Sequence, residues 1–215
     1  MMLAKPRLSA QPAHDDFTLS GVSLACGLYQ GSDAFEIRMP ASSYQDPRVE
    51  QLTDRDFMAW LPIDFGDGMI EVEVASVLAP DAPDYARGFV GVSFRIDGQG
   101  RFESIYLRPT NSQCDDQVRR NHSVQYAAYP DFRFNQLRTE FPEKYETYAD
   151  IELGRWTHLK LEVSGTRAAL YLDHQAKPAF IVSDLKLGPG QRGGVGIWIE
   201  SGTVAYFKHL NITRA

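Results

Sequence analysis

The sequence predicts an all-β fold, a two-sheet antiparallel jelly-roll sandwich, and three observations lead to it. Apolar and polar residues alternate along most of the segment 156–212. Clusters of Gly, Pro and Ser bound the alternating runs, and no stretch shows the 3.6-residue period of a long amphipathic helix. A period of two is typical of strands with one buried face. So many half-buried strands can bury their apolar sides only if two sheets pack face to face.

The last part of the chain gives the clearest strands. In the segment WTHLKLEV, Leu159, Leu161 and Val163 share one face and polar residues share the other. Turns rich in Gly and Ser separate this segment from the later strands. We expect strands over residues 156–163, 168–173, 180–182, 195–200 and 204–212.

The earlier part of the chain continues the pattern with shorter runs. We expect strands over residues 16–19, 22–29, 34–39, 58–62, 68–77, 90–96, 102–107 and 123–127. Residues 40–55 are polar and predict a loop, and residues 129–151 predict an irregular excursion. Sandwiches of this length are commonly single domains. We therefore expect a flexible N-terminal arm over residues 1–15 and one β-sandwich domain over residues 16–215.

Composition and charge narrow the partners. The chain has 215 residues, 43% of them hydrophobic, which is enough for a full core, and its net charge is −6. That charge argues against nucleic acid and anionic membranes as partners, because both need a positive field. Residues 1–14 contain basic residues with no apolar run behind them, so the chain shows no signal peptide. A cytoplasmic protein and a mature exported form remain open.

Two cysteines, Cys26 and Cys114, occur in unrelated contexts. We expect them to be unbridged, because a disulfide needs a Cα separation of about 4.4–6.8 Å. Neither has a second Cys or a His at the spacing of a metal site. We expect no metal and no cofactor. One alternative is calcium at the Asp-rich turn 64–67, although this turn lacks the full calcium-loop pattern.

Two segments resemble a known family. WTHLKLEVSGTRAALYLD and GGVGIWIESGTVAYFKHLNI are similar to the closing strands of the concanavalin A-like lectin/glucanase superfamily. The resemblance is strongest to its laminin-G-like and bacterial glycosidase-associated members, and it covers residues 68–212 in order. It implies a concanavalin A-like jelly roll. It also implies a glycan partner, because members of this superfamily bind or cleave glycans.

The resemblance invites a test for catalytic carboxylates. Laminarinase-like members carry Glu-x-Asp-x-x-Glu on one strand, where two carboxylates about 5–5.5 Å apart can cleave a glycosidic bond with retention. Here Glu71 and Glu73 share a face, but Ser76 stands where the second catalytic Glu belongs. The motif therefore fails. Glu71 and Glu73 are either ordinary outward-facing strand residues or carboxylates of a different site.

Strand parity places several functional side chains on one face. Val90, Val92, Phe94 and Ile96 are predicted to face the core, as are Ile105 and Leu107. The opposite face, which we expect to be concave, then carries Arg95, Tyr106, Arg108, Gln125 and Trp198. Tyr and Trp offer an apolar plate with a polar tip, which suits a sugar ring. The alternative is a solvated sheet with cross-strand ion pairs.

Loop residues extend this candidate site. Asn111, Arg120 and His122 fall in loops next to the central strands, where binding residues commonly collect. Arg119 and Arg120 are suited to a carboxylate or sulfate, because Arg binds such groups in a bidentate manner. Asp115 and Asp116 offer an alternative, since they can pair with these arginines within the chain.

Three functions remain open at this point. The first is a lectin-like domain that binds an oligo- or polysaccharide on its concave face; it should show a flatter face with Trp198 or Tyr106 exposed. The second is a glycoside hydrolase or polysaccharide lyase that uses Tyr, His and Arg; it should bring His122 and Tyr126 together with an Arg and a carboxylate. The third is a protein-interaction sandwich without sugar, which should show a large exposed apolar patch.

Overall fold

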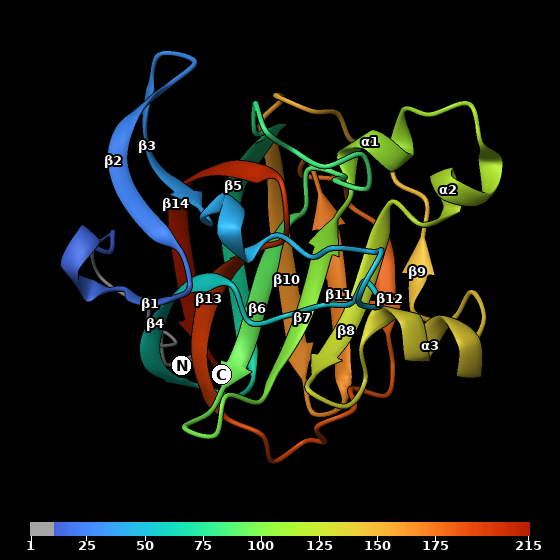
Figure 1. Ribbon diagram of the computed structural model, residues 1–215. Helices are drawn as coiled ribbons and strands as arrows, with labels where there is room; N and C mark the ends of the chain where they lie inside the picture. The colour runs from blue at the N-terminus through green and yellow to red at the C-terminus, as the bar shows by residue number, and fades with distance from the viewer. Residues whose placement is uncertain (1–10) are drawn as a thin grey trace.

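The computed structural model describes residues 11–215, which form two antiparallel sheets packed face to face (Figure 1). Each sheet has seven strands. The prediction of an all-β jelly-roll sandwich is confirmed.

The front sheet, which faces the viewer in Figure 1, has the strand order β1-β4-β13-β6-β7-β8-β9. Its strands are β1 (Thr18–Ser20), β4 (Met58–Phe65), β13 (Gly193–Ile199), β6 (Val90–Ile96), β7 (Phe102–Leu107), β8 (Val124–Tyr129) and β9 (Glu146–Thr147). The late strand β13 lies between β4 and β6, so the front sheet joins segments far apart in the sequence.

The back sheet has the order β12-β11-β10-β5-β14-β3-β2. Its strands are β12 (Phe180–Val182), β11 (Arg167–Leu172), β10 (Thr157–Ser164), β5 (Gly68–Leu78), β14 (Thr203–Arg214), β3 (Ser32–Arg38) and β2 (Ser23–Tyr29). Strands β2 and β3 form a hairpin whose tip extends beyond the rest of the sandwich (Figure 1).

The alternation read from the sequence builds the core between the sheets. In β10, Leu159, Leu161 and Val163 are buried, and Leu161 lies between Ile70 of β5 and Leu170 of β11. The front sheet supplies its own apolar face to the same cluster. Full burial of such a side chain contributes about 1.5–3 kcal/mol, so alternation alone gives each strand a strongly preferred face.

Strand β6 departs from simple alternation near its end. Phe94 pairs with Val195 and Ile96 pairs with Gly194, so Arg95 between them is unpaired and has a φ of 57°. This is a β-bulge, in which one extra residue reverses the parity of the residues after it. Ile96 therefore joins a small apolar cluster on the outer face with Phe102. The prediction that Ile96 faces the main core is wrong.

Three short helices lie in the connections between β7 and β9. They are α1 (Pro109–Ser112), α2 (Gln117–Asn121) and α3 (Phe134–Glu140), and they flank the β8–β9 side of the sandwich (Figure 1). Helix α2 begins after Asp116, whose carboxylate accepts hydrogen bonds from the N–H groups of Val118 and Arg119, as a preferred N-cap does. Asp116 thus caps the helix and forms no ion pair with Arg119. None of the helices in residues 11–215 has the length and apolarity needed to cross a membrane.

Only part of the predicted N-terminal arm can be compared with the structure. Most of the expected arm, residues 1–10, lies outside the described residues, and His14–Asp16 forms a 3₁₀-helix that precedes β1. A second 3₁₀-helix, Ala41–Ser43, lies in the polar segment before β4. Cys26 and Cys114 are both free, as expected.

Candidate functional site

A row of directly opposed residues crosses the outer face of the front sheet. Backbone register places one residue of each of six strands side by side in this row. The row runs Met58, Trp198, Gly91, Tyr106, Gln125 and Glu146. Tyr106, Gln125 and Trp198, which parity assigned to one face, thus lie in one line.

Gly91 allows the two large aromatic side chains of this row to meet. It lies between Trp198 and Tyr106, whose ring centroids are 4.4 Å apart. A Cβ at Gly91 would lie 2.4 Å from the Cα of Tyr106 and from the carbonyl oxygen of Ile105, which is too close for any side chain. The Trp198 indole N–H donates to the carbonyl oxygen of Arg55 at 2.6 Å, which fixes the ring. Tyr106 and Trp198 are both buried, so they form a rigid aromatic layer beneath the surface of the sheet, and the exposed Trp198 or Tyr106 expected of a binding face is not found.

Arg108 extends from the end of β7 over this buried aromatic layer and is only 4% exposed. Its guanidinium donates to the hydroxyl of Tyr106 at 2.8 Å and to Oε1 of Gln125 at 3.1 Å. The guanidinium carbon also lies 5.0 Å from the ring centroid of Tyr106 and 5.1 Å from that of Phe134. Cation–π contacts of this kind strengthen when water is excluded. Arg108 is thus held in one orientation by three neighbours.

Asp54, from the loop before β4, completes the network below Arg108. It accepts hydrogen bonds from the Tyr106 hydroxyl at 2.6 Å and from the Phe134 N–H at 2.7 Å. Burial raises the pKa of Asp54, and burial also raises the pKa of Tyr106 well above 10. Tyr106 is therefore protonated at neutral pH, and its hydroxyl donates a hydrogen bond to Asp54.

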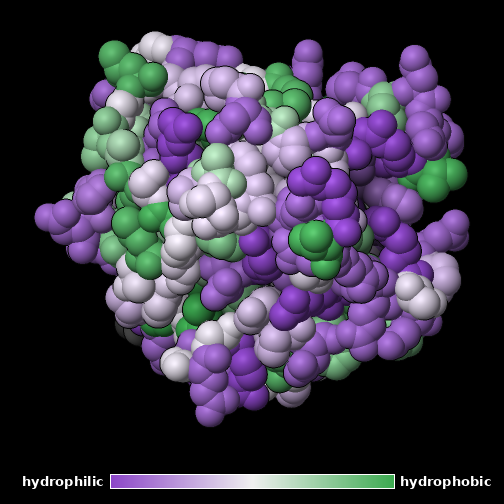
Figure 2. Space-filling model, viewed as in Figure 1, coloured by the Kyte–Doolittle hydropathy of each residue, from purple (hydrophilic) through white to green (hydrophobic). Residues whose placement is uncertain are grey.

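A pocket of about 250 Å³ opens beside Asp54 and Arg108. We call it the front pocket. Of the residues that parity placed on this face, Arg108 lines the pocket, whereas Tyr106, Gln125 and Trp198 are buried beneath it and are not part of its lining. The polar walls of the pocket come from the segments before β4 and β6, from α1, α2 and α3, and from the end of β13. Its charged and polar lining includes Asp54, Arg87, Arg108, Asn111, Arg119, His122, Arg138 and Glu200. Hydrophilic residues predominate on the right-hand part of the face shown in Figure 2.

The wall beside β9 carries His122 and Arg138, which share one carboxylate. Arg138 pairs with Glu146 at 2.7 Å, and Nε2 of His122 lies 3.2 Å from the same carboxylate. Burial lowers the pKa of His122, and Arg138 lowers it further against the attraction of Glu146. His122 is consequently neutral at pH 7 and can donate or accept one hydrogen bond at each ring nitrogen.

The predicted loop residues divide between the front pocket and the surface outside it. Asn111 lies in the pocket wall, where its amide donates to the carbonyl oxygen of His122 and accepts from Arg119 at 3.3 Å. Arg120, the next residue of α2, turns away and contacts Tyr148 through a hydrogen bond of 3.2 Å and a ring contact of 5.2 Å. The structure therefore brings Asn111 and His122 to the pocket but leaves Arg120 outside it.

The placement of Arg95 on the concave face is wrong. The bulge turns its fully buried side chain toward the loops at one end of the sandwich, where it forms hydrogen bonds with four groups. Its acceptors are the carbonyl oxygens of Gly66, Gly165 and Gly188 and the carboxylate of Asp67. Parity misplaces Arg95 because the bulge depends on pairing with β13 and leaves no local sequence signal.

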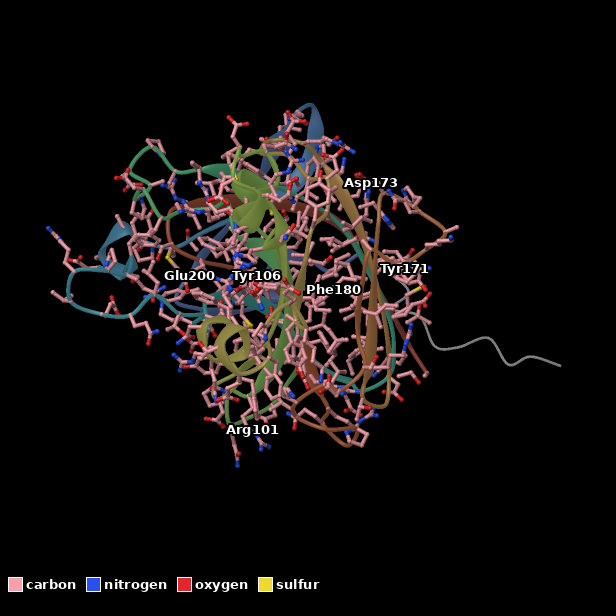
Figure 3. The ribbon with its side chains drawn as sticks, turned by 90° about the vertical axis from the view of Figure 1, so that its right-hand side faces the viewer. Arg101, Tyr106, Tyr171, Asp173, Phe180 and Glu200 are labelled. Atoms are coloured by element: carbon pink, nitrogen blue, oxygen red, sulfur yellow. The ribbon has the colours of Figure 1, made fainter. Side chains whose placement is uncertain are left out.

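Glu71 and Glu73 lie on the outer face of the back sheet, on the opposite side of the molecule from the front pocket. Glu73 pairs with Lys208 at 3.4 Å and with His209 at 2.7 Å, and Glu71 lies 3.9 Å from His158. The two sides are visible in Figure 3, where Tyr106 and Glu200 lie on the front side and Tyr171 and Asp173 on the back side. Glu73 thus forms a cross-strand ion pair with Lys208, and Glu71 faces His158 on the same solvated sheet.

The Asp-rich turn is engaged by arginines. Asp64 pairs with Arg192 at 2.8 Å and Asp67 with Arg95 at 2.9 Å. Within the described part of the chain, no three His, Cys, Asp or Glu side chains are grouped so that they could hold a metal ion.

The grouping expected of a Tyr- and His-based enzyme does not form in full. Tyr126 faces the core between the sheets, where its hydroxyl donates to Glu103 and accepts from the N–H of Lys186. His122 instead has Arg108, Arg138, Glu146 and Asp116 as its charged neighbours. Tyr126 therefore does not join His122 in the front pocket.

Sequence reasoning missed several residues of the front pocket. Asp54 and Phe134 come from segments without periodicity, so no local pattern marks them. Glu200 and Arg87 carried a usable signal, since Glu200 has the same strand parity as Trp198, and Arg87 the same parity as Gly91. Extending the alternation beyond the strand ends would have found both.

Comparisons with known proteins show the fold. No protein-family model and no curated protein sequence matches the chain. Among solved structures, the chain is similar to carbohydrate binding module CBM66 from Bacillus subtilis, with a TM-score of 0.56 and 13% identity over 91% of this chain and 97% of that one. It is also similar to a protein of unknown function with a galectin-like fold from Bacillus subtilis, with a TM-score of 0.58 and 11% identity over 93% of this chain and 90% of that one. At these identities the likeness establishes that the chain has the sandwich fold that these proteins share.

Proposed function

We propose that the protein is a carbohydrate-binding domain that holds part of an oligo- or polysaccharide in the front pocket. The observation that carries the proposal is the fixed position of Arg108. Its side chain is locked by Tyr106, Gln125 and Phe134 at the wall of an open pocket. Groups held in advance in their bound geometry reduce the entropy lost on binding.

The composition of the pocket supports a sugar as the ligand. Phe89 and Phe134 offer apolar surface, and Arg87, Asn111 and His122 offer donors and acceptors around them. A sugar ring presents apolar C–H faces and a rim of hydroxyl groups, so it matches such a lining. The similar structure named a carbohydrate binding module supports the same function.

Two features favour binding over glycoside hydrolysis or elimination. The carboxylates in the pocket are engaged, because Asp54 accepts two hydrogen bonds and Glu200 pairs with Arg55. Tyr106 holds its proton far above neutral pH, so it is a poor general base.

Adjacent arginines of α2 give a matched test. Arg119 lines the front pocket, whereas Arg120 contacts Tyr148 outside it. We expect the wild-type protein to bind members of a glycan array. Arg119→Ala should weaken binding of the best glycan about tenfold, the loss expected for one charge-assisted hydrogen bond of about 1.5 kcal/mol, and Arg120→Ala should bind as the wild type does. Calorimetric titration measures both.

Either of two results would contradict the proposal. One is an array with no bound glycan. The other is a glycan whose affinity falls equally with both substitutions, because that result would place the binding surface outside the front pocket.

A further inference from the structure

Three arginines line the front pocket without an ion-pair partner among residues 11–215. Arg87 donates to the backbone carbonyl oxygens of Asp84 and Ala86 at 2.8 and 2.7 Å. Arg119 donates to the amide oxygen of Asn111, and Arg108 to that of Gln125. The acceptors are all neutral, so the three positive charges are not compensated by direct contacts.

The nearby carboxylates are already occupied. Glu200 pairs with Arg55, and Glu146 pairs with Arg138. Asp54 has both oxygens engaged by the Tyr106 hydroxyl and the Phe134 N–H, and its pKa is raised by burial. The front pocket therefore has an excess of positive charge within a protein whose net charge is −6.

The uncompensated arginines are close enough to repel one another. Burial lowers the pKa of Arg87, and the charges of Arg119 and Arg108 lower it further. Keeping like charges together in a partly buried wall costs free energy. A bound anion would remove this cost, so the repulsion favours an anionic ligand over a neutral one.

We infer that the sugar bound in the front pocket carries an anionic group, either the carboxylate of a uronic acid or a sulfate ester, and that Arg87 and Arg119 bind this group. The inference rests on the proposed function, since it names the class of glycan. Guanidinium groups form paired hydrogen bonds with carboxylate and sulfate oxygens. Among the described residues, Arg87 uses only Nη1, on two carbonyl oxygens, and Arg119 uses only Nη2, on one amide oxygen, whereas Arg108 is already held by three neighbours.

The overall charge helps to define the partner. A net charge of −6 gives no long-range attraction for an extended polyanion such as nucleic acid. Selectivity for the anion must therefore come from short-range contacts within the pocket. This favours a glycan that inserts one charged unit.

The test compares each acidic glycan with its own neutral form. Hexasaccharides of homogalacturonan and alginate are titrated beside their carboxyl-reduced derivatives, and a sulfated galactan hexasaccharide beside its desulfated derivative. The proteins are the wild type, the double variant Arg87→Gln/Arg119→Gln and the control Arg120→Gln. Every further glycan found on the array is treated in the same way.

We expect at least one acidic form to bind about tenfold or more tightly than its neutral form. This preference should weaken with added salt, persist in Arg120→Gln and vanish in Arg87→Gln/Arg119→Gln. A preference among the uronates identifies a carboxylate, and a preference for the sulfated galactan identifies a sulfate; both support the inference.

Failure of the inference differs from failure of the proposed function. If neutral forms bind as tightly as acidic forms and their affinity falls when Arg119 is replaced, the front pocket binds glycans but the inference of an anionic group is wrong. If the acidic preference remains in Arg87→Gln/Arg119→Gln, the anion binds elsewhere and the assignment is wrong. If no glycan binds, the proposed function fails and the inference fails with it.

Discussion

Arg95 and Arg108 show how one residue type takes two roles on neighbouring strands. Both are buried, and strand parity assigns both to the same face. Arg108 lines the front pocket and is held by the buried Tyr106, whereas Arg95 joins three loops at the end of the sandwich. The difference arises from one extra residue in β6, which only the pairing with β13 reveals.

We expect Arg95→Met to destabilise the protein by about 3 kcal/mol or more. The substitution keeps a similar volume but leaves the carbonyl oxygens of Gly66, Gly165 and Gly188 without their donor. Urea unfolding measures the change. Glycan affinity should stay at the wild-type value, because Arg95 does not line the front pocket.

Arg192→Gln is the matched control for Arg95→Met. Arg192 pairs with Asp64 near the same end of the molecule, but 54% of its side chain is exposed. Exposed pairs contribute about 0–1 kcal/mol. A loss as large in Arg192→Gln as in Arg95→Met would show that burial is not what gives Arg95 its importance.

His158 should make stability depend on pH. Its ring stacks on His174 with centroids 3.8 Å apart, and its Nδ1 is buried without a partner. Burial lowers the pKa of His158 below 6.5, and the charge of His174 lowers it further. The unfolded chain therefore binds the proton more readily, so stability is lost as pH falls through 6.5.

We expect His158→Gln to remove this contribution. Lowering the pH from about 7.5 to about 5.5 should reduce the unfolding free energy of the wild type more than that of His158→Gln. His122 also has a lowered pKa, but it is present in both proteins and cancels in the comparison. A difference that stays constant with pH would contradict the prediction.

At the scale of elements, the strands were predictable and the site was only partly so. Alternation is a local property, so it located every strand except β9, which has two residues. Neighbours within a sheet are not local, since β13 lies between β4 and β6. Parity could therefore place Tyr106, Gln125 and Trp198 on outward faces but could not show that they form one row. It also could not find Asp54 or Phe134, which loops and short helices bring to the pocket.

The close approach of β6 and β7 at Gly91 leaves no room for a side chain. We expect Gly91→Ala to destabilise the protein by at least about 2 kcal/mol, because the new Cβ overlaps backbone atoms of β7 that cannot move aside. The methyl group would also separate Trp198 from Tyr106 and displace Arg108, so glycan affinity should fall. Urea unfolding and calorimetric titration measure the two effects.

Gly98→Ala provides the comparison for Gly91→Ala. Gly98 lies in the turn after β6, and, among residues 11–215, no atom outside Gly98 and its two chain neighbours lies within 4 Å of the position of its Cβ. Substitutions at such surface positions usually change stability by less than about 0.5 kcal/mol. If Gly91→Ala is as mild as Gly98→Ala, the close approach of β6 and β7 is not a constraint on the site.

At the scale of the whole molecule, the two sheets share one apolar cluster. Residues of both sheets contribute to it, so neither sheet can expose its inner face without exposing that of the other. Opening the sandwich would expose many side chains that each contribute about 1.5–3 kcal/mol when buried. Separate unfolding of one sheet is therefore very unfavourable, and we expect the sandwich to unfold in one cooperative step.

The three tryptophans can report on the two sheets separately. Trp60 and Trp198 belong to the front sheet, and Trp156 directly precedes β10 of the back sheet. Trp156→Phe leaves fluorescence from the front sheet, and Trp60→Phe/Trp198→Phe leaves fluorescence from the back sheet. In each variant the urea midpoint from fluorescence should equal the midpoint from far-ultraviolet circular dichroism of the same sample. Comparing two probes within one variant removes any effect of the substitution on stability. Midpoints that differ between the probes would mean that one sheet can unfold while the other stays folded. The shared core would then not hold the sandwich together as one domain.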